Sequence, residues 1–498
     1  MAREPSGAPR ASFVLGAVVL ALAASYAAAI VTTGGSILLL APLICALFML
    51  AVFAHPAIGV YVLFGGALLF EQFAVAGLSP ITQYARFFVN LSSYTPIPLR
   101  LSLADLIVFM TFASLLAQRL RAKHQPLRLG VFGCAVLGYV AVFVLGAVIG
   151  AVRGGSWNAD VTLNELRAPF QLCFTYFLAV NLIRDRRQLS VFIWLFVLVV
   201  GIKALQGILN YLEARNLPYW IEAVTNHEDV MFFGVAVALM VAAVVLGIRG
   251  RIVLALLLMQ PIIITADLLA NRRVGLIGLG VTLFAITLLT FVTHPKRAAV
   301  LATLGSVALA VYATIFWDAT GPVAEPIRAL RSVVDASATS ILDQASNVWR
   351  DVENQNIAYT VQQLPFTGVG LGQRYLFERE PAEAGAQVGF IYWRYITHNA
   401  LLWLWLKAGP LGAFALWFLV ARGLLEAAAL YRRLRDPWLR WMVTLPISLI
   451  VGQIVFSSVD LGLTYSRMMI VLGTSLGLAA LLAEQHPVAK PASTGRTA

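Results

Sequence analysis

Long apolar runs separated by short polar connections dominate the chain. Most runs approach 20 residues, the length that an α-helix needs to cross about 30 Å of hydrocarbon. The pattern predicts an all-α, polytopic membrane protein with about fourteen spans, within a range of twelve to fourteen. The predicted spans lie near 12–31, 35–54, 57–75, 103–118, 129–150, 164–183, 189–211, 230–248, 252–269, 274–292, 298–316, 398–421, 438–459 and 465–482.

One polar stretch, residues 317–397, is much longer than the other connections. Within it, Ile341, Val348 and Val352 recur at roughly helical spacing and predict a helix over 341–363, which Pro365 would end. We therefore expect a single membrane domain over residues 1–484 with one large helical loop. The last residues, 485–498, are rich in Pro, Ala, Ser and Thr and predict a disordered tail.

Basic residues predict how the chain crosses the membrane. They cluster in alternate connections, at 119–128, 184–187, 249–251 and 432–440. By the positive-inside rule both termini are cytoplasmic, and the 317–397 loop faces outward. Basic loops lying against anionic membrane lipids account for the net charge of +12, so no nucleic-acid partner is predicted.

Composition excludes a soluble domain. The chain has 60% apolar and 12% charged residues, whereas soluble domains carry roughly 25% charged residues. The cysteines Cys45, Cys134 and Cys173 lie in apolar spans, where small core residues are expected rather than disulfides or metal ligands. Zinc-type spacing, a P-loop, a nucleophile elbow and a dinucleotide fingerprint are all lacking in the sequence, so we predict no metal and no cofactor.

The segment at His398 and Asn399 carries the clearest candidate chemistry. It places an imidazole where the polar loop meets an apolar helix that contains Lys407 and Gly409. This position suits chemistry on a substrate with a polar head and a lipid tail, although an interfacial helix cap is the simpler alternative. Arg394 precedes His398 by four residues and would share its helix face if the helix began early. Its charge would lower the histidine pKa and favour the neutral base.

Outward arginines are not explained by the positive-inside bias. Arg272 and Arg273 stand at the outer junction of two spans, and Arg350 lies in the predicted loop helix. Guanidinium groups bind phosphate bidentately, which favours anion recognition. The alternatives are interfacial anchoring for the first two and a pair with Glu353 or Asn354 for Arg350. Adjacent helical residues point about 100° apart, so we expect only one of Arg272 and Arg273 to face the site.

Weaker signals complete the candidate set. Three alternate glycines form a turn between Arg350 and His398, and another outward connection ends in three polar residues that are candidate acid–base or substrate-binding groups. These six residues are Gly368, Gly370, Gly372, His227, Glu228 and Asp229. Lys203 and Lys407 fall inside spans and should face the bundle interior or a polar cavity.

Together, the order of these motifs resembles the O-antigen ligase and polysaccharide polymerase superfamily of bacterial inner-membrane proteins. The resemblance covers roughly residues 230–420. The matching motifs are Asn271-Arg272-Arg273, Trp349-Arg350-x-x-Glu353-Asn354, Pro365-x-x-Gly368-x-Gly370-x-Gly372, His398-Asn399-x-x-Leu402 and Gly409-x-x-Gly412.

The resemblance implies a GT-C-like glycosyltransferase of the inner membrane with its active site facing the periplasm. Its donor would be a glycan on undecaprenyl diphosphate, and it would need neither nucleotide sugar nor metal. Arg350 with Arg272 or Arg273 would hold the diphosphate, and His398 would activate the acceptor hydroxyl for a single, inverting displacement. The remaining substrate-binding candidates are Asn399, Arg394, Glu353, Asn354, Gly368, Gly370, Gly372, His227, Glu228 and Asp229.

The acceptor stays open at this point. It is a lipid A-core sugar for a ligase, a second lipid-linked glycan for a polymerase, or a protein hydroxyl. A lipid-linked oligosaccharide transporter is the alternative from a different class. Transporters often contain internal repeats with paired broken helices, and the sequence shows no such symmetry.

Overall fold

The computed structural model describes residues 57–75, 77–96, 98–121, 126–217, 223–319, 321–334, 341–380 and 392–487, together with 21, 24–28, 31–32 and 40–56. The chain divides into two compact units, Met1–Pro56 and Ala57–Ala498. The first contains the short apolar helix α2 (Leu40–Ala54). Most of the span predicted at 12–31, and residues 488–498 of the predicted tail, lie outside the described residues.

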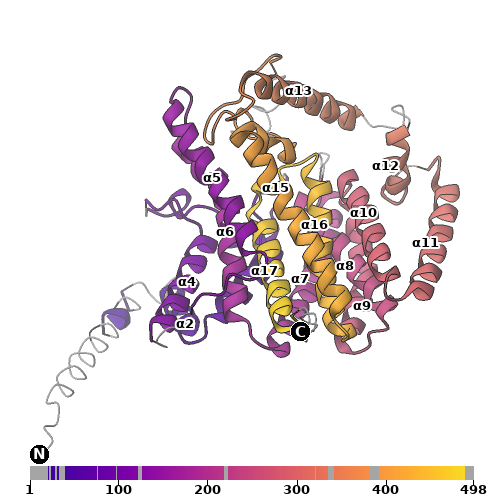
Figure 1. The fold of residues 1–498 in the computed structure, drawn as a ribbon, viewed down its shortest axis with the longest axis horizontal. Coiled ribbons are helices and arrows are strands. Elements are labelled where there is room, and N and C mark those ends of the chain that lie inside the picture. Colours follow the sequence, from indigo (N-terminus) through magenta and orange to yellow (C-terminus); the bar gives the residue numbers. More distant parts are fainter. Residues whose placement is uncertain are drawn as a thin grey trace, which may run out of the picture. The chain divides into compact units, whose positions relative to one another are not determined.

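The second unit is helical throughout its described part, with no strand there (Figure 1). Short 3-10 turns join its helices at η2 (Ile81–Ala85), η3 (Leu91–Ser93), η4 (Pro322–Ala324) and η6 (Gly462–Thr464). The helices are α3 (Ala57–Leu69), α4 (Leu103–Arg121), α5 (Gly133–Arg153), α6 (Ala159–Leu182), α7 (Arg186–Ala214), α8 (His227–Leu246), α9 (Arg251–Leu269), α10 (Arg273–Phe291), α11 (Pro295–Phe316), α12 (Glu325–Val334), α13 (Ile341–Gln363), α15 (Ala400–Arg433), α16 (Pro437–Ser457) and α17 (Ser466–Gln485).

Ten of the described helices are long and apolar enough to cross a membrane, namely α4, α5, α7 to α11 and α15 to α17. By length and composition the chain is a multi-pass membrane protein. The prediction of about fourteen spans is too high for the described residues. The spans predicted at 35–54 and 57–75 correspond to the shorter helices α2 and α3, and the span at 164–183 corresponds to α6, which is not among the ten.

Helices α6 and α17 form the centre of the bundle. The whole apolar stretch of α17 is buried, and α17 packs most extensively against α6. Close approach depends on glycine, since a Cβ on Gly473 would lie 2.4 Å from the Leu172 carbonyl oxygen. In contrast, none of the apolar stretch of α11 is buried, so this helix presents its side chains outward.

The long polar stretch folds over one end of this bundle. In Figure 1, α13 lies across the end at which α15 begins, and α12 lies beside it. Helix α13 matches the helix predicted over 341–363. It packs against α15, while α12 packs against α10. Consequently the loop helices meet the two places where the sequence puts candidate residues, the starts of α10 and α15.

Helix α15 is interrupted within its apolar part. Gly409 has φ 66° and ψ −159°, and Pro410 follows it. Proline lacks the N–H that would continue the helical hydrogen bonds, and glycine tolerates the left-handed φ without strain. The interruption exposes carbonyl groups of the preceding turn, and these are used by the loop described below.

Candidate functional site

Glu353 of α13 and His398 form the central pair of the site. His398 precedes α15 and directs Nδ1 at the Glu353 carboxylate, 2.9 Å from Oε2 and 3.0 Å from Oε1. The His398 backbone N–H donates to the same carboxylate at 3.2 Å. The Glu353 side chain is only 1% exposed, whereas that of His398 is 29% exposed. Because the carboxylate holds Nδ1, His398 would exchange protons with a substrate through Nε2.

The pKa of His398 differs from the sequence-based expectation. Burial lowers this pKa, but the hydrogen bond to Glu353 and the charge of its carboxylate raise it by more, so the net shift is upward. The expectation that Arg394 lowers the pKa is therefore wrong. Arg394 lies outside α15, binds Glu380 at 3.0 Å and stacks over the ring of Trp393.

A second contact between α13 and the start of α15 joins Asn354 to Asn399, the residues that directly follow Glu353 and His398. The Asn399 side chain donates to Asn354 Oδ1 at 3.2 Å. Its own Oδ1 accepts the backbone N–H of Leu402 at 3.1 Å and so caps α15. The start of the apolar helix is thus fastened to α13 by two adjacent side-chain pairs, and this fixes the orientation of the His398 imidazole.

Arg350 lies one turn before Glu353 on α13. Its Nε donates to the Val459 carbonyl at 3.0 Å, and Nη1 donates to Ser346 Oγ at 2.7 Å. Both hydrogen bonds differ from the pairing with Glu353 or Asn354 that its position suggested. The charges of Asp460, Glu353, Arg273 and Arg272 all act on it. Arg350 therefore connects the loop to the α16–α17 connection beside the histidine.

The two adjacent arginines point to different partners. Asn271 adopts a left-handed φ of 53°, Arg272 occupies the N-cap position of α10, and Arg273 is the first residue of the helix. Arg273 reaches the loop, donating to Asn347 Oδ1 at 3.3 Å. Arg272 lies close enough to Tyr465, at the start of α17, for its charge to act on the phenol. The charges of both arginines act on Arg350.

A second histidine–carboxylate pair stands beside the first. His227, the first residue of α8, places Nδ1 2.7 Å from Asp460 Oδ2. The sequence predicts His227 as a candidate but not Asp460, whose local signal is an acidic residue in the short connection between two apolar spans. The Leu461 N–H and the Tyr465 hydroxyl hold the other oxygen of Asp460 at 2.7 and 2.9 Å.

Glu228 and Asp229 turn away from His227 into the bundle. Both side chains are 1% exposed and flank the fully buried Arg467, whose Nη2 lies 2.6 Å from Asp229 Oδ1. Lys203 joins the cluster at 3.6 Å from Asp229, as its predicted interior position requires. The structure therefore places Glu228 and Asp229 in an internal ionic cluster rather than on a substrate surface.

The three alternate glycines join the loop to the interrupted helix. Gly368, Gly370 and Gly372 all have positive φ, at 62°, 92° and 74°. The Gly370 N–H donates to the carbonyl of Lys407 at 3.0 Å, next to the break in α15. A Cβ on Gly370 would lie 2.3 Å from the backbone nitrogen of Gly150. These glycines allow close backbone packing, and they do not converge with His398 and Arg350 on a ligand surface.

Lys407 occupies the interior as predicted. It is fully buried, 2.9 Å from Glu165 Oε1 of α6, and it donates to the Gln373 carbonyl at 2.7 Å. The partner carboxylate also accepts the N–H of Gly372. This pair explains how α6 carries charged residues inside the bundle, since a buried charge needs a partner of opposite sign.

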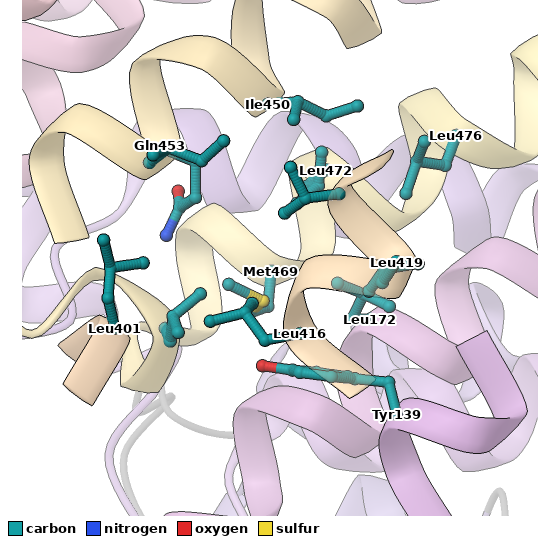
Figure 2. Close-up of a pocket in the computed structure, with 13 residues that line it drawn as sticks. Tyr139, Leu172, Leu401, Leu416, Leu419, Ile450, Gln453, Met469, Leu472 and Leu476 are labelled. Atoms are coloured by element: carbon teal, nitrogen blue, oxygen red, sulfur yellow. The ribbon is translucent and has the colours of Figure 1, made fainter. Parts of the chain in front are cut away.

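A small apolar pocket of about 30 Å³ lies between α5, α6, α15, α16 and α17 (Figure 2). Leucines dominate its lining, and Figure 2 shows Tyr139 and Gln453 as the polar residues among them. Two lining residues, Leu401 and Leu463, follow His398 and Asp460 by three positions each. The pocket lining is thus close in the chain to one residue of each histidine–carboxylate pair.

Comparison with known protein families finds no family model that matches the chain, and no curated protein is significantly similar to it. Any function therefore rests on the chemistry of these residues, which comprise an imidazole oriented by a carboxylate and the guanidinium groups near it.

Proposed function

We propose that the protein is a membrane glycosyltransferase that transfers a glycan from an undecaprenyl-diphosphate donor to an acceptor hydroxyl at the periplasmic face. The observation that carries the proposal is the convergence of the Glu353–His398 pair with Arg350 and Arg272. A base and a set of fixed cations are the two elements that displacement of a diphosphate by a hydroxyl requires.

In the proposed reaction, His398 Nε2 accepts the proton of the acceptor hydroxyl as its oxygen bonds to the anomeric carbon of the donor. The bond between that carbon and the diphosphate oxygen breaks, and the electron pair leaves with the lipid diphosphate. Glu353 stabilises the imidazolium that forms. Arg350 and Arg272 balance the charge on the leaving group. A single displacement of this kind inverts the anomeric centre.

The position of His398 supports a lipid-linked substrate, because it directly precedes α15, which is long and apolar enough to cross a membrane. A polyprenyl chain lying along the apolar helices would leave its diphosphate near the starts of α10 and α15, where Arg272 and His398 stand. Binding energy from the chain would then orient the reacting carbon relative to His398.

The same geometry supports a ligase or a polymerase, since both reactions use this donor. Transport of the lipid-linked glycan is less well supported. Broken helices of transporters line a substrate cavity, whereas the break at Gly409 is filled by the loop backbone, with the Phe366 carbonyl oxygen 2.3 Å from where a Gly409 Cβ would be.

Transfer by purified protein in lipid nanodiscs tests the proposal. The donor is a labelled glycan on undecaprenyl diphosphate, offered with lipid A-core, with a second lipid-linked glycan or with a peptide that presents hydroxyl side chains. We expect wild-type protein to release undecaprenyl diphosphate and to label one acceptor, which also separates ligase from polymerase. No release with any of the three acceptors, from protein that is folded and binds the donor, would refute glycan transfer.

A further inference from the structure

The site contains two imidazole–carboxylate pairs of the same design. His398 uses Nδ1 to bind the buried Glu353 at 2.9 Å, and His227 uses Nδ1 to bind Asp460 at 2.7 Å. In both pairs the carboxylate is nearly inaccessible, while the histidine side chains are 29% and 41% exposed. Each imidazole is thus held by a fixed anion on one nitrogen and directs Nε2 elsewhere.

The second pair lies among the groups assigned to the diphosphate. Asp460 directly follows Val459, whose carbonyl accepts the hydrogen bond from Arg350 Nε. Tyr465 donates a hydrogen bond to Asp460 through its hydroxyl, and this tyrosine lies within range of the charge of Arg272. His227 is therefore bound to a segment that contacts Arg350 and that ends at Tyr465, on which the charge of Arg272 acts.

Asp460 is also shared electrostatically by both histidines. Burial raises the pKa of its carboxyl, but the charges of His227 and His398 lower it by more, so the net pKa lies well below its usual range. The carboxylate stays ionised and able to stabilise a positive charge on His227.

We propose that His227 binds the diphosphate of the lipid-linked donor through Nε2, as a further cation of the leaving-group site. This inference rests on the proposed glycan transfer and assigns to it a residue in addition to the arginines. With a carboxylate at Nδ1 and a phosphate oxygen at Nε2, the imidazole lies between two anions and binds as the imidazolium. Asp460 acts through His227 as a positioning residue.

The assignment distinguishes the two histidines by role. A base must release its proton to be ready for the next acceptor, so His398 acts on the acceptor side. His227 keeps its proton and donates a hydrogen bond to the departing diphosphate. Removing it should weaken binding of the leaving group even when no acceptor is present.

Binding of inorganic pyrophosphate to the full chain in nanodiscs tests this role without any transfer step. Titrations contain EDTA so that the anion is free of metal. We expect His227→Ala to bind pyrophosphate about 10- to 100-fold more weakly, as expected for loss of a hydrogen bond between charged groups. His294→Ala is the matched control, because His294 caps α11 at the far end of α10 from Arg272 and should bind as wild type does.

Two further variants separate this role from a structural one. His227→Gln keeps a polar side chain for folding and should also lose affinity, with a raised donor KM and a smaller change in kcat. Asp460→Asn should weaken binding in wild-type protein and have little further effect in His227→Ala. Equal pyrophosphate affinity in wild type, His227→Ala and His227→Gln would overturn the inference while leaving glycan transfer intact. Wild-type protein that neither binds pyrophosphate nor transfers glycan would overturn both.

Discussion

Glu353 Oε2 lies 2.9 Å from His398 Nδ1, although 45 residues separate the two in the chain. This contact joins the loop helix α13 to the start of the interrupted helix α15. It orients one ring nitrogen, stabilises the protonated ring and leaves chemistry to the other nitrogen.

Removal of the His398 imidazole should abolish transfer without abolishing donor binding. Loss of a general base typically costs about 10²- to 10⁴-fold in rate, so His398→Ala should lower kcat by this factor. Donor binding, measured separately in nanodiscs, should change little. Near wild-type turnover would reduce His398 to a structural link between α15 and α13.

Glu353 should determine where on the pH scale the activity is lost. Only neutral imidazole accepts a proton. The transfer rate should therefore increase as pH rises through the His398 pKa and decrease as pH drops below that pKa. Glu353 raises that pKa above its ordinary value. In Glu353→Gln the opposing effect of burial remains, and the acidic limb of the kcat profile should move to lower pH while the maximal rate falls. A limb that does not move would exclude His398 as the titrating base.

The two adjacent arginines should separate into a binding role and a folding role. Arg272→Ala should raise the donor KM by about 10- to 100-fold through loss of a charged hydrogen bond. Arg273→Ala removes the contact with Asn347 of α13 and should instead lower thermal stability.

Arg350→Lys keeps the charge, loses the planar fork and should still impair transfer. Arg331→Ala, which alters an exposed contact of α12 with Asp318, is the control.

The glycine turn should be sensitive to a single methyl group. Gly370→Ala introduces a Cβ 2.3 Å from the Gly150 nitrogen at a φ of 92°. Overpacking and strain of this kind typically cost about 1–3 kcal/mol each, so folded protein should be reduced in the membrane. Gly154→Ala is a control for backbone strain alone, because Gly154 has a positive φ but open space around its Cβ position. Gly305→Ala is a control with neither strain nor a close contact. Equal stability of all three would show that the turn is not a packing element.

The predicted orientation can be tested by thiol labelling. With Cys45, Cys134 and Cys173 replaced by alanine, Glu378→Cys places a thiol on the exposed loop surface. A membrane-impermeant reagent should label it in cells with a permeabilised outer membrane. Arg249→Cys, in the connection before α9, should be labelled only after the inner membrane is disrupted. The reverse pattern would place the site on the cytoplasmic face.

Hydrophobic patterning predicts most of the helices because a membrane span is a local property of about 20 residues. It also predicts α13, whose apolar spacing and terminating Pro365 are visible in the sequence. Patterning is less reliable at α6, where Glu165 and Arg167 interrupt the apolar run. Their placement depends on partners elsewhere in the chain, and for Glu165 that partner is Lys407.

The sequence by itself determined the residue types at the candidate site and their positions at helix starts and in the loop. Only the tertiary structure decided the partners. It paired His398 with Glu353 and His227 with Asp460, and it buried Asp229 against Arg467. These choices depend on which helix ends meet across the bundle, and no local periodicity encodes that. The pKa of His398 follows from such a meeting, since the carboxylate of Glu353 outweighs both burial and the charge of Arg350.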